Sequence, residues 1–195
     1  MSIQAVIAFL LYVLINAFTP GPGNLLALNT VVNYGWSKGR KLFWGIFAGY
    51  YAVQIFCAIF VFGLNELLSP VISVMKYIGA AYILYLSIHI AISKPTEATE
   101  QKSASFWKGF ILQFVNVKIY LFGVTALSGY VVRYYSTLDM LIYFELIIAT
   151  IGTIATITWI FLGKIFRQAY QKHYRIINFI LTVGLLQCAY SILFK

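Results

Sequence analysis

The sequence predicts an all-α, polytopic membrane protein whose six transmembrane helices form two inverted three-helix repeats within one membrane-embedded domain, residues 1–195. Three observations predict this fold. Of the 195 residues, 62% are hydrophobic and 10% are charged, whereas soluble domains contain about 25% charged residues. The apolar residues fall into six runs near the roughly 20 residues that a membrane-spanning helix needs. Polar and helix-breaking residues lie deep inside the first run of each half of the chain.

Short connections join the predicted spans, and no soluble domain is inserted between them. The spans cover residues 3–31, 42–63, 70–92, 106–129, 138–162 and 175–194. The longest connection, 93–105, is polar and is predicted to be a cytoplasmic linker between repeat 1 (about 1–92) and repeat 2 (about 106–195). Residues 1–15 lack the basic start of a signal peptide, so the first run is expected to remain as a span.

The formal net charge of +9 predicts an orientation in the membrane rather than a nucleic-acid partner. Lys and Arg accumulate in the cytoplasmic loops of membrane proteins. The first, third and fifth loops are therefore predicted to be cytoplasmic, and both termini to face the periplasm of a bacterial inner membrane. The ten basic residues on these loops are Lys38, Arg40, Lys41, Lys94, Lys102, Lys108, Lys164, Arg167, Lys172 and Arg175.

The first span contains its own helix breakers in the stretch "FTPGPGN", residues 18–24. Each proline removes a backbone donor and clashes with the preceding turn, so we expect a break at 19–23 rather than a simple proline kink. Such a break persists in a membrane only where protein or a wet cavity covers it. The second half-helix would present free amides and a positive dipole end to a carboxylate. The candidate residues are Thr19, Pro20, Gly21, Pro22, Gly23 and Asn24.

The fourth span contains the counterpart of this motif: Gln113, Asn116 and Lys118 lie within six residues of an apolar run. Lys118 is about 12 residues from the cytoplasmic start of the span, or ~18 Å at the helical rise. A lysine at that depth costs roughly 2.5–3.5 kcal/mol and usually has a function. The alternative is a lysine whose ammonium group extends to the headgroups.

Other polar residues in the spans give weaker predictions. Apart from Asp139 at the start of the fifth span, Glu145 is the only acidic residue in a predicted span, and it is expected near the membrane surface or at a cavity mouth. Cys57 and Cys188 are interpreted as small packing residues without metal-ligand spacing. Glycines repeat along spans two and five and could pack helices within one chain or between chains, so a homo-oligomer stays open.

At these residues the chain resembles the LysE/RhtB superfamily of bacterial amino-acid exporters. The shared motifs are "TPGPGN" (19–24), "GAAYILYL" (79–86) and the Asn-x-Lys element at 116–118. Within the superfamily, residues 105–128 are most similar to the cysteine/O-acetylserine exporters. Most relatives have proline where this chain has Val117, and the same branch shares that departure. Span four therefore has no proline to break it.

The resemblance implies a secondary exporter, not an enzyme, that moves small amino acids such as cysteine and O-acetylserine from cytoplasm to periplasm. It implies that no cofactor or metal is needed. It also implies that an ion gradient drives export, and protons are the expected ion. The substrate carboxylate would meet Gly21 to Asn24 and Lys118, and its amino group would meet carbonyls freed by the break. Thr19, Gln113 and Asn116 would orient it. The alternatives are export of another amino acid, such as homoserine or threonine, and a polytopic enzyme acting on lipid.

Overall fold

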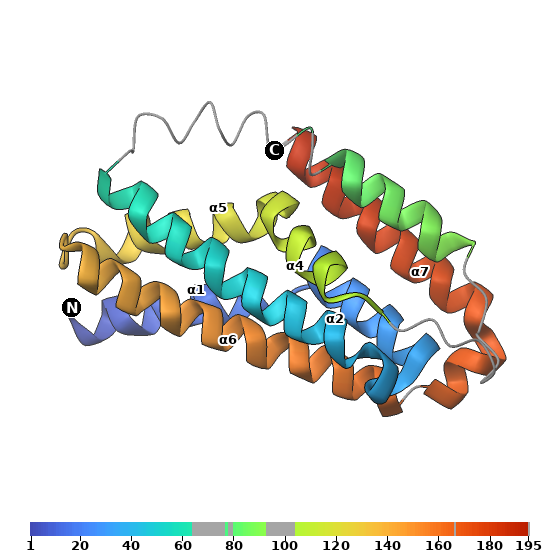
Figure 1. Cartoon of the computed structure of the whole chain (residues 1–195). Helices are drawn as coiled ribbons and strands as arrows, with labels where there is room; N and C mark the ends of the chain where they lie inside the picture. The colour runs from blue at the N-terminus through green and yellow to red at the C-terminus, as the bar shows by residue number, and fades with distance from the viewer. Residues whose placement is uncertain (64–76, 78–79, 93–103, 166, 195) are drawn as a thin grey trace.

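The computed structural model describes residues 1–63, 77, 80–92, 104–165 and 167–194, and in this part of the chain the regular structure is entirely helical. Figure 1 shows the helices packed lengthwise, with the N-terminus at one end of the bundle. The labelled elements are α1 (Ile3–Phe18), α2 (Pro22–Gly63), α4 (Phe106–Val115), α5 (Val117–Ala126), the π-helical turn η1 (Leu127–Val131), α6 (Leu138–Ile165) and α7 (Arg167–Phe194). A further helix, Ala80–Ala91, lies beside α7.

The described helices identify a multi-pass membrane protein. α2 and α6 are long and apolar enough to cross a membrane, and α4 with the segment Val117–Val131 forms a third such unit, bent by 56°. α1 and Ala80–Ala91 are apolar but shorter than 18 residues. Residues 70–76 and 78–79 of the predicted third span (70–92), and residues 93–103 of the predicted linker (93–105), lie outside the described residues. The six-span count therefore stays a prediction.

The first connection differs from the predicted loop between residues 31 and 42. α2 continues through this region as helix, except at Gly35, where φ is 74° and ψ is 174°. Glycine tolerates a positive φ because it has no Cβ. The chain turns back at this residue, since a Cβ on Gly39 would lie 3.1 Å from Cγ2 of Thr30. One glycine thus replaces the expected loop.

Contacts between the described connections and helix ends place Lys38, Lys108 and Lys164 at one end of the bundle. The amide of Ala104 donates to the carbonyl of Lys38 at 3.2 Å, which joins the start of the fourth predicted span to the first connection. Gly163, near the end of α6, packs against Leu28 and Val31 of α2. The first connection, the start of α4 and the end of α6 therefore lie together.

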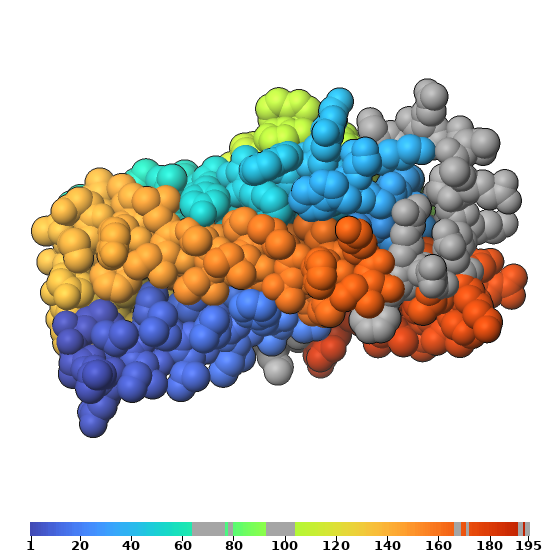
Figure 2. Space-filling model, turned by 90° about the horizontal axis from the view of Figure 1, so that it is seen from below, coloured from blue at the N-terminus to red at the C-terminus, as the bar shows by residue number. Residues whose placement is uncertain are grey.

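The bundle has a buried apolar core, but its surface and its buried polar groups differ from those of a soluble protein. Large apolar side chains are exposed along the helices, among them Ile7, Leu11, Phe62, Phe161 and Phe179. Figure 2 shows α1 and α6 side by side on one such face. Polar side chains lie inside instead, and these are Asn24, Asn29, Thr30, Asn33, Gln54, Ser87, Gln113, Asn116, Glu145, Thr156 and Asn178. This distribution fits a lipid solvent, in which polar groups must find partners within the protein.

Glycines bring α2 close to its neighbours within this one chain. A Cβ on Gly45 would overlap the carbonyl oxygen of Phe106, and one on Gly109 would overlap that of Leu42. These two contacts hold α2 and α4 backbone to backbone. On the other side of α2, Gly152 of α6 lies against the ring of Tyr50. Gly45, Gly49, Gly152 and Gly163 thus allow close helix packing within the chain, as small residues do at membrane-helix interfaces, whereas a Cβ on Gly63 would meet nothing within 4 Å.

Replacement of Gly45 by alanine is expected to lower the thermal midpoint of the detergent-solubilised protein. The added methyl group would force α4 away from α2, and overpacking of this kind costs about 1–3 kcal/mol. The midpoint is measured by loss of the monodisperse chromatographic peak after heating. Gly129→Ala is the matched control, because a Cβ there meets nothing within 4 Å. Equal midpoints for Gly45→Ala and wild type would contradict the close packing.

Candidate functional site

The first helix break lies where the sequence predicted it. α1 ends at Phe18, Thr19 has an extended conformation with ψ 146°, and α2 begins at Pro22. Proline suits the first position of a helix because its missing amide would have no intrahelical partner. Residues 19–21 are not helical. The segment is therefore a complete break and not a proline kink.

The second break lies at Asn116 and needs no proline. Asn116 has φ −85° and ψ 84°, and it separates α4 from α5. Its amide donates to the carbonyl of Gln113 at 3.2 Å, and its own carbonyl accepts from Ile119 at 3.0 Å. These short-range bonds replace the helical ladder. Asparagine favours such local turns because its side chain competes for backbone groups.

Lys118 joins the two breaks. Its Nζ donates to the carbonyl of Thr19 at 3.0 Å, to Thr19 Oγ1 at 2.9 Å and to the carbonyl of Pro20 at 3.4 Å. An ammonium group has three protons and no acceptor, and a cation is favoured at the negative end of a helix dipole. Lys118 thus caps α1 from another part of the chain. Its ammonium does not extend to the headgroups.

The other carbonyls at the end of α1 also have side-chain donors. Asn24 Nδ2 donates to the carbonyls of Ala17 at 3.1 Å and Thr19 at 3.3 Å, and Asn24 Oδ1 accepts from Thr156 of α6 at 2.8 Å. Trp159 Nε1 donates to the carbonyl of Phe18 at 3.2 Å. The end of a helix leaves four carbonyls without intrahelical partners. Here Thr19 donates to the carbonyls of Ile15 and Asn16, and α2 and α6 supply the donors for those of Ala17 and Phe18.

A small cavity lies where the start of α2 faces the second break. Its volume is about 20 Å³, room for about one water molecule. A Cβ on Gly23 would lie 3.1 Å from Nε2 of Gln113, so this buried amide is close to the first turn of α2. Gln113 Nε2 and Asn116 Oδ1 have no hydrogen-bond partner. The residues that line the cavity include Gly21, Gly23, Asn24, Gln113, Asn116 and Lys118 of the predicted set, together with Asn16, Tyr50 and Thr156.

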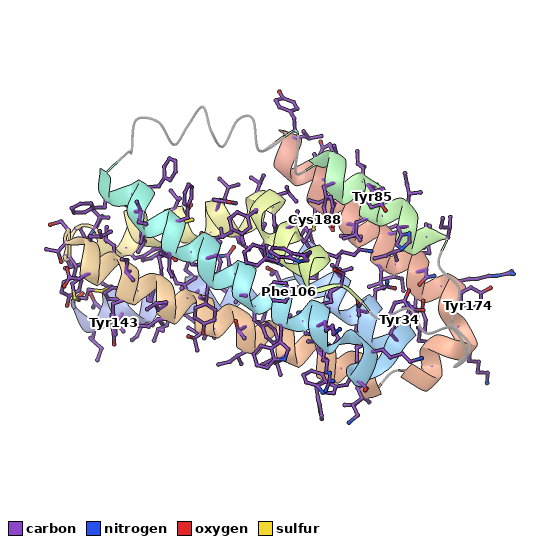
Figure 3. The ribbon with its side chains drawn as sticks, viewed as in Figure 1. Tyr34, Tyr85, Phe106, Tyr143, Tyr174 and Cys188 are labelled. Atoms are coloured by element: carbon purple, nitrogen blue, oxygen red, sulfur yellow. The ribbon has the colours of Figure 1, made fainter. Side chains whose placement is uncertain are left out.

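A larger groove, of about 490 Å³, lies on the other side of Lys118, within the range of about 300–1,000 Å³ usual for small-molecule sites. Thr19 and Pro20 line it, and α7 contributes Gln187 and Cys188. Figure 3 labels Cys188 on α7, and its Sγ lies 3.9 Å from the carbonyl of Pro20. Lys118 lines both spaces and stands between them.

The structure brings most of the predicted site residues together and adds several more. Pro22 is buried but lines neither space. Cys188 lines the groove, whereas the sequence indicated only a packing role. Asn16 could have been found from its place one helical turn before Thr19. Gln187, Thr156 and Trp159 carry no local signal, because their roles depend on how α6 and α7 pack.

The position of Glu145 in the structure differs from the predicted one. The sequence placed it near the membrane surface or at a cavity mouth, but its side chain is fully buried between helices and lines neither space. The reason is its position opposite Gly123 of α5, where a Cβ would lie 2.9 Å from Oε1 of Glu145. The missing side chain at Gly123 makes room for the carboxyl group.

The sequence matches one family model, described as LysE type translocator, over residues 14–195. A cysteine/O-acetylserine efflux protein of Klebsiella pneumoniae is 40% identical over 186 residues, 95% of each chain. The efflux proteins of the same name from Salmonella paratyphi A and Escherichia coli O157:H7 are 38% and 36% identical over 188 residues, 96% of each chain. No solved structure matches this chain.

The match extends from the broken first span to the last helix, so it includes both breaks, Lys118 and the α7 residues of the groove. The relatives are covered over nearly their whole length. On this similarity, the chain belongs to the LysE type translocator family.

Proposed function

We propose that this chain exports small amino acids, cysteine and O-acetylserine, from the cytoplasm to the periplasm across the bacterial inner membrane. The names of the relatives support this substrate class. The observation that carries the proposal is that two broken helices meet at the half-buried Lys118, which lines both a small cavity and a larger groove. Broken helices at the interface of two halves are typical substrate sites of secondary transporters.

The amino group of the substrate binds the carbonyls that Lys118 now occupies. Thr19 and Pro20 present their oxygens to the ammonium group of Lys118 at 3.0 and 3.4 Å. An α-ammonium group has the same charge and the same three donors. The substrate therefore displaces Lys118 by chemical equivalence, and the carbonyls of Thr19 and Pro20 have a donor in both states.

The substrate carboxylate binds the start of α2 and the released Lys118. The first amides of a helix lack intrahelical partners and favour an anion. Gly21 and Gly23 carry no side chain, so a carboxylate can approach these amides closely. Gln113 Nε2, buried and without a partner, supplies a further donor, and Asn116 completes the wall.

Movement of Lys118 also opens the site. The inner cavity of about 20 Å³ is too small for an amino acid, whereas the groove of about 490 Å³ is large enough. Lys118, Asn16 and Phe122 line both spaces. Displacement of the lysine side chain joins the cavity to the groove. The substrate therefore enters in the same step in which the ammonium group of Lys118 leaves the carbonyls of Thr19 and Pro20.

The six-span, inverted-repeat topology is part of this proposal. The start of each half contains a broken helix, at 19–21 and at Asn116. The connections that carry Lys38 and Lys164 lie at one end of the bundle, which supports a cytoplasmic location for that end. Both termini then face the periplasm.

Counterflow in proteoliposomes tests the substrate class. Vesicles with the purified protein are loaded with unlabelled O-acetylserine or cysteine, and entry of the labelled compound is followed. We expect labelled substrate to accumulate transiently, with homoserine and threonine competing poorly. Exchange of homoserine or threonine alone would shift the proposal to the other substrate class. If protein that elutes as a folded species exchanges no amino acid, export is contradicted.

Lys118→Ala is expected to abolish counterflow without preventing insertion. The variant removes the donor shared by Thr19 and Pro20, and a freed backbone group in the membrane interior costs several kcal/mol. Its thermal midpoint is therefore measured as well. Lys118→Arg retains the positive charge and hydrogen-bond donors, but its guanidinium group is planar and larger than an ammonium group. We therefore expect a folded protein with slower exchange. Lys164→Ala, at an exposed lysine, is the control. Wild-type exchange by Lys118→Ala would rule out this role.

A further inference from the structure

Glu145 of α6 is a fully buried acid that the proposed substrate site does not use. Its exposed fraction is 0%, and neither Oε1 nor Oε2 has a hydrogen-bond partner. Among the described residues, no Lys, Arg or His forms an ion pair with it. An isolated carboxylate in a low-dielectric interior is very costly and takes up a proton instead. The resident form of Glu145 is therefore the neutral carboxylic acid.

A second unpartnered oxygen lies beside Glu145. Gln54 of α2 is also 0% exposed, and its Oε1 has no hydrogen-bond partner. A Cβ on Gly123 would overlap Gln54 Oε1 and would lie 2.9 and 3.2 Å from the two oxygens of Glu145. The three oxygens thus surround one point on α5. A protonated carboxyl group is the donor that Gln54 lacks, since an amide oxygen only accepts.

We propose that Glu145 and Gln54 form a proton-binding site that couples export to the proton gradient. This inference rests on the proposed export function. In each cycle, a proton from the periplasmic side forms an O–H bond on Glu145, with Gln54 Oε1 as acceptor. The proton leaves as that bond breaks toward the cytoplasm, and substrate moves outward. The carboxylate exists only while water reaches the site.

The position of Gln54 connects this site to the second helix break. Gln54 Nε2 donates to the carbonyl of Ile119 at 3.4 Å, and Ile119 directly follows Lys118 on α5. Tyr50, one helical turn before Gln54, lines the small cavity. Movement of Lys118 and α5 on substrate binding therefore changes the packing of Ile119 and Gly123 against Gln54 and Glu145. Coupling passes through this helix.

The surroundings favour a proton over a metal cation. Among the described residues, the titratable groups that interact with Glu145 are Tyr50 and Cys57 of α2, and Tyr50 also has a side-chain hydrogen bond with Gln54. On α5 the neighbour is Gly123, which has no side chain. The site offers three free oxygens, whereas hard cations such as Ca²⁺ take about six or more oxygen ligands. Neither described cavity includes Glu145 or Gln54. A proton needs only the carboxyl group and one acceptor.

The test compares Glu145→Gln with wild type in proteoliposomes that have an acidic lumen, where outward proton flow drives substrate inward. We expect complete loss of gradient-driven accumulation of O-acetylserine in Glu145→Gln, while counterflow at equal pH persists. The amide has the shape of the protonated acid but cannot release a proton. Asp139→Asn is the matched control, because it makes the same chemical change at an exposed site on the same helix.

Two results would overturn the inference: gradient-driven accumulation by Glu145→Gln at the wild-type level, or a wild type driven by a sodium gradient and not by protons. A second measurement is independent of transport. The infrared difference spectrum, wild type minus Glu145→Gln at neutral pH, is expected to contain the C=O band of a protonated carboxyl group, and its absence overturns the site. If the band is present but no amino acid exchanges, the export proposal fails and the proton site stands.

Discussion

The rest of the structure depends on the carbonyl groups that α1 exposes where it ends inside the membrane. Proline and glycine end the helix at Phe18. In the hydrocarbon region no lipid group can donate a hydrogen bond to the carbonyls that this break frees. Lys118, Asn24 and Trp159 donate to these carbonyls from α5, α2 and α6. Three helices are therefore fixed around the first break. The break determines the packing of the bundle as well as the location of the site.

Close helix packing follows from the same constraint. Gln113 can reach the start of α2 only if α4 approaches α2 closely, and Gly45 and Gly109 allow that approach because no side chain separates the two backbones. Small residues at membrane-helix interfaces have this general effect. The apolar side chains that these helices do not need for packing face the lipid. The inside contains the buried polar groups together with two clusters of buried apolar side chains.

A transporter must hold its polar site satisfied both with and without substrate. Here the carbonyls of Thr19 and Pro20 accept from the ammonium group of Lys118, which has the same charge and donors as the amino group of the substrate proposed above. In the proposed cycle, the substrate replaces this contact without leaving these carbonyls unpaired. The uncompensated oxygens of Glu145 and Gln54 lie one helix away, where a proton can respond to the same movement.

The sequence by itself determined that the chain breaks at 19–23 and that Lys118 has an interior role. These features follow from covalent geometry and from the cost of a buried charge, which act locally. The tertiary structure decided the rest. Asn116 breaks its helix without proline, Gly35 replaces a loop, and Glu145 lies buried against Gly123. These features depend on how the helices pack against one another. The residues that contact each other, such as Trp159 and Phe18, lie far apart in the sequence.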